Sequence, residues 1–321
     1  MDPTGFRADL ALVPESLQRL AAALDHGLPE IPTASRTLVL GMGSSRYAAG
    51  PVALAARAAG RDTWVELASA ILLPPPADDL LVIAVSATGT SAEVLSAAQR
   101  YSGHGRLVAV TNTAESELAQ QSDAVVPMGA GIEVGGVACR TYRHTIAVLL
   151  SLLAPAVVPD LGEMCRKAAQ ASSYLLETAD EWLGPVSEAL AAPHGTFTLA
   201  PVERLGSAQQ SALMLREGPR RLASACETGD WSHVDVYLTK TYDYRALVFA
   251  GSAWDEPALE WMRGRGTTYV GVGADLPGAT ATVRFPDDDD PWVSLLTEVM
   301  VGELLAHRWW AHDPSFSWSG R

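Results

Sequence analysis

The sequence predicts an α/β fold with two successive domains, each built on a parallel sheet that carries helices on both faces. Short runs of consecutive apolar residues alternate with helical stretches, and this alternation occurs in both halves of the chain. A strand that is apolar at consecutive positions is buried on both faces, which is typical of parallel sheets covered by helices. A length of 321 residues is sufficient for two domains, each with its own core.

The first half begins with a helical segment and continues with five predicted strands. Leucines at steps of three and four residues predict helix over residues 1 to about 30. The pattern that follows predicts strands at 37–45, 64–68, 80–86, 106–112 and 124–130, an alanine-rich helix at about 46–59 and a helix at 93–100. Ligands of such sheets bind at the carboxyl ends of the strands, so the turns after the first and third strands are candidate sites.

A second set of strands and helices follows a predicted linking helix at about 161–182, and Pro155 and Pro159 support a break before it. The second set is predicted to comprise strands at 196–200, 244–252 and 267–274 and helices at 207–217 and about 293–310. We therefore expect an N-terminal helix and first domain in 1–158, a linking helix in 159–190, and a second domain with a C-terminal tail in 191–321.

Composition narrows the classes of partner and compartment. The net charge of −14 argues against nucleic acid and anionic membranes as partners, although a local site can still hold an anionic metabolite. Three cysteines without paired spacing suit a reducing cytoplasm and indicate no metal site. The N-terminus lacks the pattern of a signal peptide, and no apolar run approaches membrane-spanning length. We expect a cytoplasmic protein.

The turn after the third strand has the composition of an anion-binding site. Ser86, Thr88 and Ser91 supply hydroxyl groups, and Gly89 allows close approach of the backbone to a ligand. The helix that follows presents unpaired N–H groups at its positive end, and phosphate is the expected anion. No P-loop lysine and no dinucleotide-binding glycine pattern accompany the turn. The alternative is an ordinary strand-to-helix turn capped by Ser or Thr.

Four segments resemble the SIS (sugar isomerase) domain family in their order and spacing: GMGSSRYAA, SATGTSAE, VTNTAESELAQQSDAVVPMGAGIEVGGVACRTY and LREGPRRLASACETGDWSH. The resemblance is closest to double-SIS enzymes, namely the isomerase half of glucosamine-6-phosphate synthase, aminosugar-phosphate deaminases and fructosamine-phosphate deglycases. It covers almost the whole chain and implies two tandem SIS domains, each a flavodoxin-like parallel sheet. It also implies a homodimer that needs no metal or organic cofactor.

The resemblance assigns roles to individual positions. Ser45, Ser86, Thr88 and Ser91 would hold the phosphate of a sugar phosphate, and backbone groups near Gly136 and Ala138 would contact sugar hydroxyls. Glu133 and Arg140 would be structural neighbours of this site, or simply an ion pair or cap at a loop.

Glu217 occupies the position of the enolising glutamate in this family. Aldose–ketose interconversion needs a base that moves a proton between neighbouring carbons, and a shielded carboxylate suits that task. His233 matches the histidine that reaches into the partner subunit's site and assists ring opening, for which an imidazole is suited near pH 7. The alternatives are a solvated helix carboxylate for Glu217 and an ordinary turn residue for His233.

The chain departs from the pattern of the family mainly in its second half. No lysine follows Lys240, and Ala200 and Val202 replace glycines in the turn after the strand at 196–200. We expect a sugar-phosphate isomerase that acts on a phosphorylated sugar or aminosugar, with or without deamination. A non-catalytic sugar-phosphate-binding regulator is the alternative.

Three further groups of residues each have a functional and a structural interpretation. Arg216, Arg220 and Arg221 could assist phosphate recognition or be surface charges. Trp231, Trp309, Trp310 and Trp318 could cover the site or a dimer interface, but packing is the simpler explanation. The acidic run 287–290 lacks the pattern of a calcium loop, and a solvated turn or helix cap is expected there.

Overall fold

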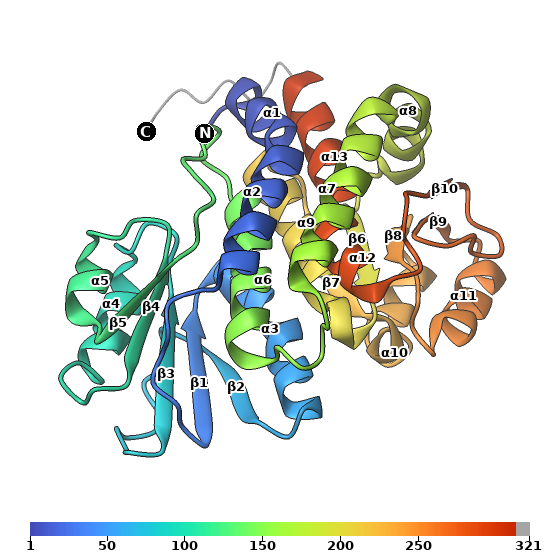
Figure 1. Cartoon of the computed structure of the whole chain (residues 1–321). Coiled ribbons are helices and arrows are strands. Elements are labelled where there is room, and N and C mark those ends of the chain that lie inside the picture. Colours follow the sequence, from blue (N-terminus) through green and yellow to red (C-terminus); the bar gives the residue numbers. More distant parts are fainter. Residues whose placement is uncertain (313–321) are drawn as a thin grey trace, which may run out of the picture. The chain divides into compact units, whose positions relative to one another are not determined.

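The computed structural model describes residues 1–312, and these form two compact units. The first unit consists of Ser16–Ile132 and Arg140–Arg166, and the second of Met1–Glu15, Glu133–Cys139 and the chain from Lys167 onward. Each unit contains one five-stranded parallel sheet, so the predicted α/β fold with two parallel sheets is confirmed (Figure 1). Residues 1–15 and 133–139 belong to the second unit, although most of that unit follows the first in the sequence.

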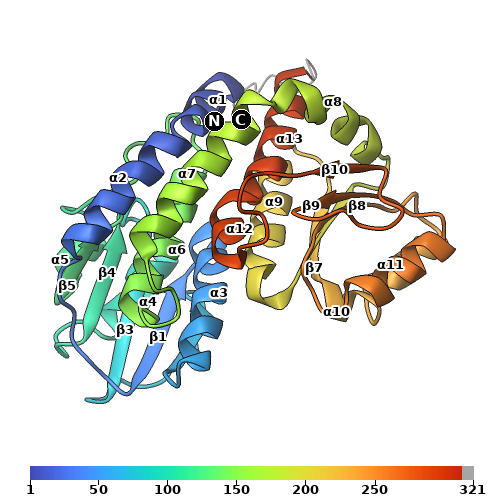
Figure 2. The ribbon, with the colours of Figure 1, turned by 45° about the vertical axis from the view of Figure 1, so that its right-hand side comes forward.

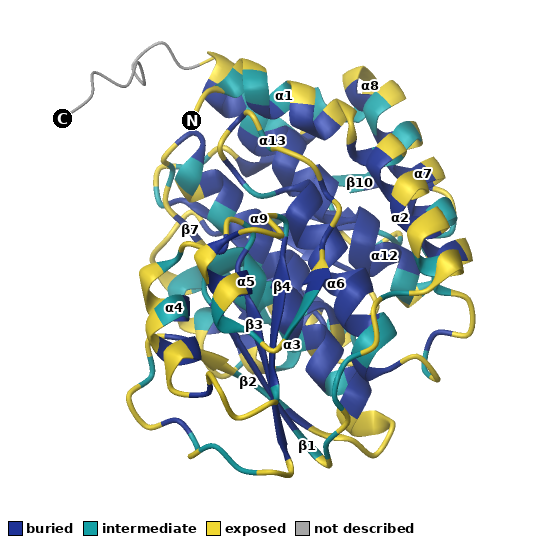
Figure 3. Cartoon of the chain, turned by 60° about the vertical axis from the view of Figure 1, so that its left-hand side comes forward, coloured by how far each residue is buried: buried dark blue, intermediate teal, exposed yellow. Residues whose placement is uncertain are grey.

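The first sheet has the strand order β2-β1-β3-β4-β5, with every neighbouring pair parallel. Its elements are β1 (Arg36–Gly41), α3 (Gly43–Ala58), β2 (Asp62–Leu67), β3 (Leu80–Val85), α4 (Ala92–Gln99), β4 (Leu107–Thr111), α5 (Glu117–Gln121), β5 (Ala124–Pro127) and α6 (Arg140–Leu153). Both β3 and β4 are buried at every position, as the consecutive apolar residues predicted (Figure 3).

Helices cover both faces of this sheet. Leu80, Val82 and Ala84 of β3 share one core cluster with side chains of α4 and α5. The intervening residues Leu81 and Ile83 are buried on the opposite face, because side chains alternate along a strand. Helix α3 packs on β1 and β2, and α6 packs on α3.

The second sheet repeats the same strand order as β7-β6-β8-β9-β10 (Figure 2). Its strands are β6 (Thr196–Ala200), β7 (Ala223–Glu227), β8 (Arg245–Phe249), β9 (Thr268–Val272) and β10 (Ala281–Val283). Its helices are α8 (Ala179–Leu190), α9 (Leu205–Glu217), α10 (Thr228–Trp231), α11 (Asp255–Gly264), α12 (Pro291–Thr297) and α13 (Val299–His312), with the short 3-10 helices η1 (Val202–Arg204) and η2 (Asp235–Lys240). Strands β7 and β10 and helices α10 and α11 were absent from the sequence-based expectation.

Two predicted helical segments differ from their expected extents. The N-terminal helical segment is two helices, α1 (Pro3–Ala11) and α2 (Val13–His26). The linking helix predicted at 161–182 ends earlier, as α7 (Leu161–Glu177), and α8 begins at Ala179. No helix among residues 1–312 is both long and apolar enough to span a membrane.

The buried side chain of His144 on α6 connects this helix to α2 and to the segment that follows β5. The ring of His144 on α6 lies 2.7 Å from the Ser16 hydroxyl through Nε2 and 2.7 Å from the Met128 carbonyl oxygen through Nδ1. The carbonyl can only accept, so Nδ1 donates to Met128 and Nε2 accepts from Ser16. Burial therefore keeps the ring neutral and lowers the pKa of His144 to about 4.

Candidate functional site

Two turns meet at the topological switch point of the first sheet. Strands β1 and β3 are neighbours, with Leu40 paired to Ala84, although β2 lies between them in sequence and on the other side of β1. The turn that contains Ser45 and the turn at residues 86–91 therefore leave adjacent carboxyl ends of the sheet. In sheets of this strand order, the crevice at such a point is the usual ligand site. The structure thus brings together the segments that carry the predicted phosphate ligands.

The turn at residues 86–91, which we call the Ser/Thr turn, is held by its own hydroxyl groups. The Ser86 hydroxyl accepts a hydrogen bond from the Gly89 N–H at 3.1 Å and lies 3.1 Å from the Ser91 hydroxyl. The Thr88 hydroxyl lies 2.9 Å from the Thr90 hydroxyl. Ser86 is buried, whereas Thr88 is exposed. The turn therefore has a buried anchor and an outer rim of hydroxyl groups.

Gly89 is the residue that shapes this turn. Its φ angle of +66° lies in the left-handed region that favours glycine. A Cβ at this position would lie 2.0 Å from the Ser116 hydroxyl oxygen at the start of α5. The turn is also bonded to that element, because the Leu118 N–H donates to the Gly89 carbonyl at 3.1 Å. Any side chain at this position would therefore displace Ser116.

The two helices that begin at this edge have no side-chain caps. Met42 precedes α3 and Ser91 precedes α4, and neither side chain accepts a hydrogen bond from the first turn of its helix. The Ser91 hydroxyl instead faces Ser86. The alternative of a simple Ser-capped turn is therefore not what the structure contains at α4. Two positive helix ends with N–H groups free of side-chain caps favour an anionic ligand here.

The predicted sugar-contacting positions lie in a loop, residues 133–139, that belongs to the second unit. Gly136 has a φ angle of +74°, so its backbone conformation requires glycine. The Ala138 carbonyl accepts a hydrogen bond at 2.8 Å from the side-chain amide of Gln210 on α9. The Glu133 carboxylate accepts from the Cys139 N–H at 2.7 Å, which matches the expected structural role of a loop cap.

Glu217 is the last residue of α9, in the second unit. Its side chain is partly buried, and burial raises the pKa of this carboxyl above its ordinary value, with the neighbouring Arg216 acting in the opposite direction. A raised carboxyl pKa is typical of a general base or acid tuned for work near neutral pH. The alternative of a fully solvated carboxylate is therefore not supported.

His233 lies in an exposed turn between α10 and η2. Its N–H donates to the Asp230 carbonyl at 2.8 Å, which fixes the turn but leaves the imidazole at the surface. The neighbouring Val234 and Tyr237 are apolar and 51% and 61% exposed. The structure therefore shows His233 beside exposed apolar side chains.

The other groups singled out in the sequence have structural roles where the structure describes them. Trp231, Trp309 and Trp310 are buried, which supports packing, and Trp318 lies outside the described residues. Asp290 caps α12 through the N–H groups of Trp292 and Val293, which confirms the expected helix cap.

The three arginines near Glu217 contact different partners. The Arg216 guanidinium donates to the Ala212 carbonyl at 3.3 Å, and that of Arg221 stacks on Trp309 at 4.3 Å from the ring centre. Arg220 has a left-handed φ angle of +53°. The two described contacts agree with the structural interpretation of this group.

Comparison with known proteins identifies the first sheet and its turns. Residues 30–155 match the family model for the SIS domain. This part of the chain is a SIS domain. The matched range contains both turns of the switch point and all four predicted phosphate ligands.

Curated relatives match a larger part of the chain than the family model does. Over 301 residues, 92% of this chain, the sequence is 25% identical to glutamine–fructose-6-phosphate aminotransferase (isomerizing) of Sulfurisphaera tokodaii, and the match covers 51% of that protein. The chain thus spans about half the length, or less, of the curated relatives it matches. These relatives share the name glutamine–fructose-6-phosphate aminotransferase (isomerizing).

Solved structures extend the likeness in fold to both units. The C-terminal domain of glucosamine-fructose-6-phosphate aminotransferase from Francisella tularensis matches with a TM-score of 0.77 and 16% identity, covering 96% of this chain and 97% of that one. Tagatose-6-phosphate ketose/aldose isomerase from Escherichia coli matches with a TM-score of 0.78 and 16% identity, covering 96% and 92%. At such identities the likeness concerns the fold, and it agrees with two tandem SIS domains.

The switch point of the second sheet is chemically different from that of the SIS domain at residues 30–155. The turn after β8 directs the Gly251 and Ser252 N–H groups to the Asp255 carboxylate, at 2.7 and 3.1 Å. Buried Arg204 follows β6 and pairs with the buried Glu298 carboxylate at 2.6 Å. The chain's own carboxylate therefore occupies the backbone donors that would face an anion. Sequence reasoning noted the lost glycines but missed Asp255, since an acidic residue in a first helical turn has no distinctive pattern.

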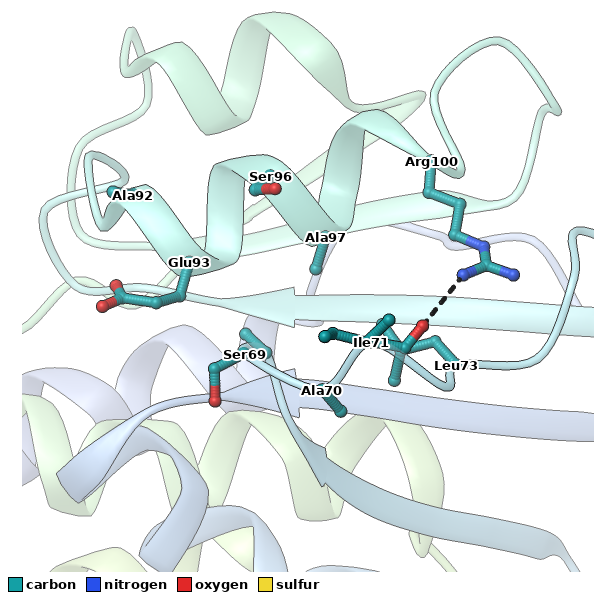
Figure 4. Close-up of a pocket in the computed structure, with 10 residues that line it drawn as sticks. Ser69, Ala70, Ile71, Leu73, Ala92, Glu93, Ser96, Ala97 and Arg100 are labelled. Atoms are coloured by element: carbon teal, nitrogen blue, oxygen red, sulfur yellow. Dashed lines mark hydrogen bonds between the residues drawn. The ribbon is translucent and has the colours of Figure 1, made fainter.

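Two open cavities lie near the switch points. One, of about 530 Å³, borders the second switch point and is lined by Arg204, Gly251, Arg284 and Asp288 among others. The other, of about 520 Å³, lies between α4 and the segment after β2, with Glu93 and Arg100 at opposite ends (Figure 4). There the Arg100 guanidinium donates to the Ile71 carbonyl at 3.5 Å. The lining of this second cavity includes none of the four predicted phosphate ligands.

Proposed function

We propose that this protein is an isomerase of a phosphorylated sugar or aminosugar, acting by ring opening and enolisation. The observation that carries the proposal is the switch point of the first sheet, where two helix N-termini without side-chain caps meet a rim of serine and threonine hydroxyl groups. A phosphate group fits this chemistry because it has several acceptor oxygens and a negative charge. The choice of a sugar as the rest of the ligand follows from the names of the relatives, which include fructose 6-phosphate and tagatose 6-phosphate.

In this proposal the phosphate accepts hydrogen bonds from Ser45, Ser86, Thr88 and Ser91 and from the backbone N–H groups at the starts of α3 and α4. Backbone groups of Gly136 and Ala138 bind sugar hydroxyls. Phosphate binding contributes affinity and holds the open-chain sugar in one position. The reactive carbons are then presented to the acid–base residues rather than to solvent.

The proton transfer is assigned to Glu217. Its carboxylate removes the proton from the carbon next to the carbonyl or imine, which gives an enediol or enolamine. The protonated carboxyl then returns the proton to the neighbouring carbon, so no proton is gained or lost overall. The raised pKa of Glu217 makes the carboxylate a stronger base than a solvated one. If C2 carries an amine, the same enolisation leads to an imine whose hydrolysis releases ammonia.

A deuterium-exchange assay tests this assignment. Fructose, glucose and glucosamine 6-phosphates are incubated with the protein in deuterated water, and uptake at C1 and C2 is followed by NMR. We expect uptake with the wild type and none with Glu217→Gln, which keeps size but cannot act as a base. Glu203→Gln, a matched change of an exposed carboxylate in the same unit, should exchange normally. Binding without exchange by the wild type would favour the regulator instead.

The phosphate ligands are tested by a separate parameter. Thr88→Val and Ser86→Ala should raise KM for sugar phosphates, because each variant loses a hydrogen bond to the phosphate. The weak binding of sugars without a phosphate should be the same in these variants as in the wild type. Ser102→Ala is the control, since this exposed hydroxyl donates to the Gln121 carbonyl at 2.9 Å, away from the switch point. An unchanged KM in both phosphate-ligand variants would contradict the assignment.

The proposal includes a homodimer in which His233 completes the site of the partner subunit and assists ring opening. The exposed imidazole and the exposed apolar side chains of Val234 and Tyr237 support an interface at this turn. A mixing experiment tests it. Glu217→Gln and His233→Ala homodimers are each inactive, but random re-association gives mixed dimers with one intact site. We expect recovery of about a quarter of wild-type activity. No recovery would place both residues in the same chain's site.

A further inference from the structure

The N-terminal helix α1 holds the 133–139 loop at one backbone position. The Gly135 N–H donates to the Asp9 carboxylate at 2.7 Å, and the Gly135 carbonyl accepts from the Asp2 N–H at 3.2 Å. Asp9 is fully buried, so its bond to Gly135 is protected from competition by water. Both polar groups of Gly135 are thus satisfied by α1 and its N-cap.

The contact between α1 and the loop is also sterically specific. A Cβ at Gly135 would lie 2.4 Å from the Phe6 backbone nitrogen and 2.9 Å from the Gly5 carbonyl carbon. Gly5 has the reciprocal restriction, because its Cβ would lie 3.0 Å from the Gly135 Cα. Two backbones therefore approach directly at a pair of glycines. This closeness allows the Asp9 carboxylate to reach the Gly135 N–H.

The other end of the loop is fixed to the helix that carries Glu217. Gln210, which is fully buried, donates to the Ala138 carbonyl at 2.8 Å. Gln210 precedes Glu217 by seven residues on α9, which corresponds to about two helical turns and roughly 10 Å. Gly136 therefore lies between a position held by α1, Gly135, and a position held by α9, Ala138.

Helix α13 joins these anchors. The Phe6 ring lies 6.2 Å from that of Trp310, and a Cβ at Gly218, next to Glu217, would lie 2.9 Å from Trp310. Helices α1 and α9 both pack on α13. Within the second unit, α1, the 133–139 loop, α9 and α13 thus form one continuous packed assembly, and the predicted base is the last residue of α9.

We propose that Asp9 is a positioning residue that sets the 133–139 loop for sugar binding, an inference that rests on the proposed function. Without the Asp9 carboxylate, the buried Gly135 N–H lacks its acceptor, and the loop gains conformational freedom that the sugar must then remove on binding. The cost falls on substrate affinity rather than on proton transfer, because Glu217 stays on α9 and Asp9 touches no reacting atom.

Three variants separate this role from a loss of stability. Asp9→Ala removes the acceptor, Asp9→Asn retains an oxygen that can accept from Gly135, and Leu10→Ala truncates a fully buried apolar side chain on the same helix. We expect Asp9→Ala to raise KM about tenfold with kcat changed less than about threefold. Asp9→Asn should largely restore KM, and Leu10→Ala should lower stability with KM unchanged. Gln210→Met, which removes the other anchor, should raise KM in the same direction.

Hydrogen–deuterium exchange of the ligand-free protein gives a readout that does not depend on activity. Exchange in residues 131–140 should be about tenfold faster in Asp9→Ala than in the wild type or Leu10→Ala. Equal exchange in Asp9→Ala and Leu10→Ala would overturn the anchoring. Faster exchange with unchanged KM and unchanged affinity for fructose 6-phosphate would overturn the positioning role. A wild type that binds no sugar phosphate would refute the proposed function, while exchange still decides the anchoring.

Discussion

Replacing Gly89 by alanine tests the geometry of the Ser/Thr turn most directly. The new Cβ would lie 2.0 Å from the Ser116 oxygen and 2.3 Å from the Ser116 Cβ, both far inside van der Waals contact. The left-handed φ angle of +66° adds about 1–2 kcal/mol for a residue with a side chain. Relief of the clash by movement of packed atoms adds about 1–3 kcal/mol. We expect Gly89→Ala to lower the free energy of unfolding by about 2–5 kcal/mol.

Gly103→Ala is the matched control for the backbone term. Gly103 has a φ angle of +78°, and a Cβ there would meet nothing within 4 Å. The free energy of unfolding of this variant should therefore fall only by the cost of the left-handed backbone, about 1–2 kcal/mol. The double variant Gly89→Ala with Ser116→Gly removes the clashing atoms, and glycine in place of this Ser N-cap costs only a few tenths of a kcal/mol. The double variant should approach the control.

Urea unfolding measures the stability of these variants, and titration with fructose 6-phosphate measures ligand affinity. Gly89→Ala should also weaken sugar-phosphate binding, because displacement of the turn moves both the hydroxyl groups and the start of α4. Equal destabilisation in Gly89→Ala and Gly103→Ala would refute the packing argument. Wild-type affinity in a destabilised Gly89→Ala variant would refute the assignment of phosphate to this turn.

Burial of neutral His144, whose pKa is lowered to about 4, predicts that stability falls as pH drops from about 6.5 to 4, since only the unfolded chain takes up the proton. This loss is about 3 kcal/mol of unfolding free energy. In urea unfolding between pH 7.5 and 4.5, the stability of His144→Gln should therefore fall less than that of the wild type. Glu298→Gln leaves the buried Arg204 without an ionised partner and should cost about 3–5 kcal/mol in the same assay. Arg216→Gln removes the charge that opposes the raised pKa of Glu217, so the acidic limb of kcat/KM should move to higher pH. A limb that stays in place would argue against Glu217 as the base.

The buried strands were predictable because their signal is local. Runs such as residues 80–85 are apolar at every position, and only burial on both faces explains that composition. Strand β7 was missed because its sequence, ASACE, carries no such run, and its pairing with β6 depends on the surrounding sheet. The boundary at Glu177 was missed for a similar reason, since α7 and α8 meet without a proline or glycine at the junction.

The candidate site was predictable in its residues but not in its supports. The Ser/Thr turn was proposed from its own hydroxyl groups and glycine, whereas Glu217 was proposed from the resemblance of its segment to the family. Asp9, by contrast, lies 126 residues from the glycine it holds, and no pattern along the chain links an acidic residue in an N-terminal helix to a distant loop. Such a contact follows from the tertiary fold.

The two sheets show why fold alone does not locate a phosphate site. Both have the same strand order, so each offers the turns of two neighbouring strands at a switch point. In the first, two helix ends without side-chain caps lie beside the hydroxyl groups of the Ser/Thr turn. In the second, Asp255 accepts the backbone N–H groups and Arg204 is neutralised by Glu298, so an arriving phosphate would find its donors taken and a carboxylate in its place. Titration with fructose 6-phosphate should therefore saturate at one molecule per chain. Binding of two equivalent molecules per chain would mean that phosphate displaces Asp255 from the Gly251 and Ser252 N–H groups. The proposed difference between the two switch points would then be wrong.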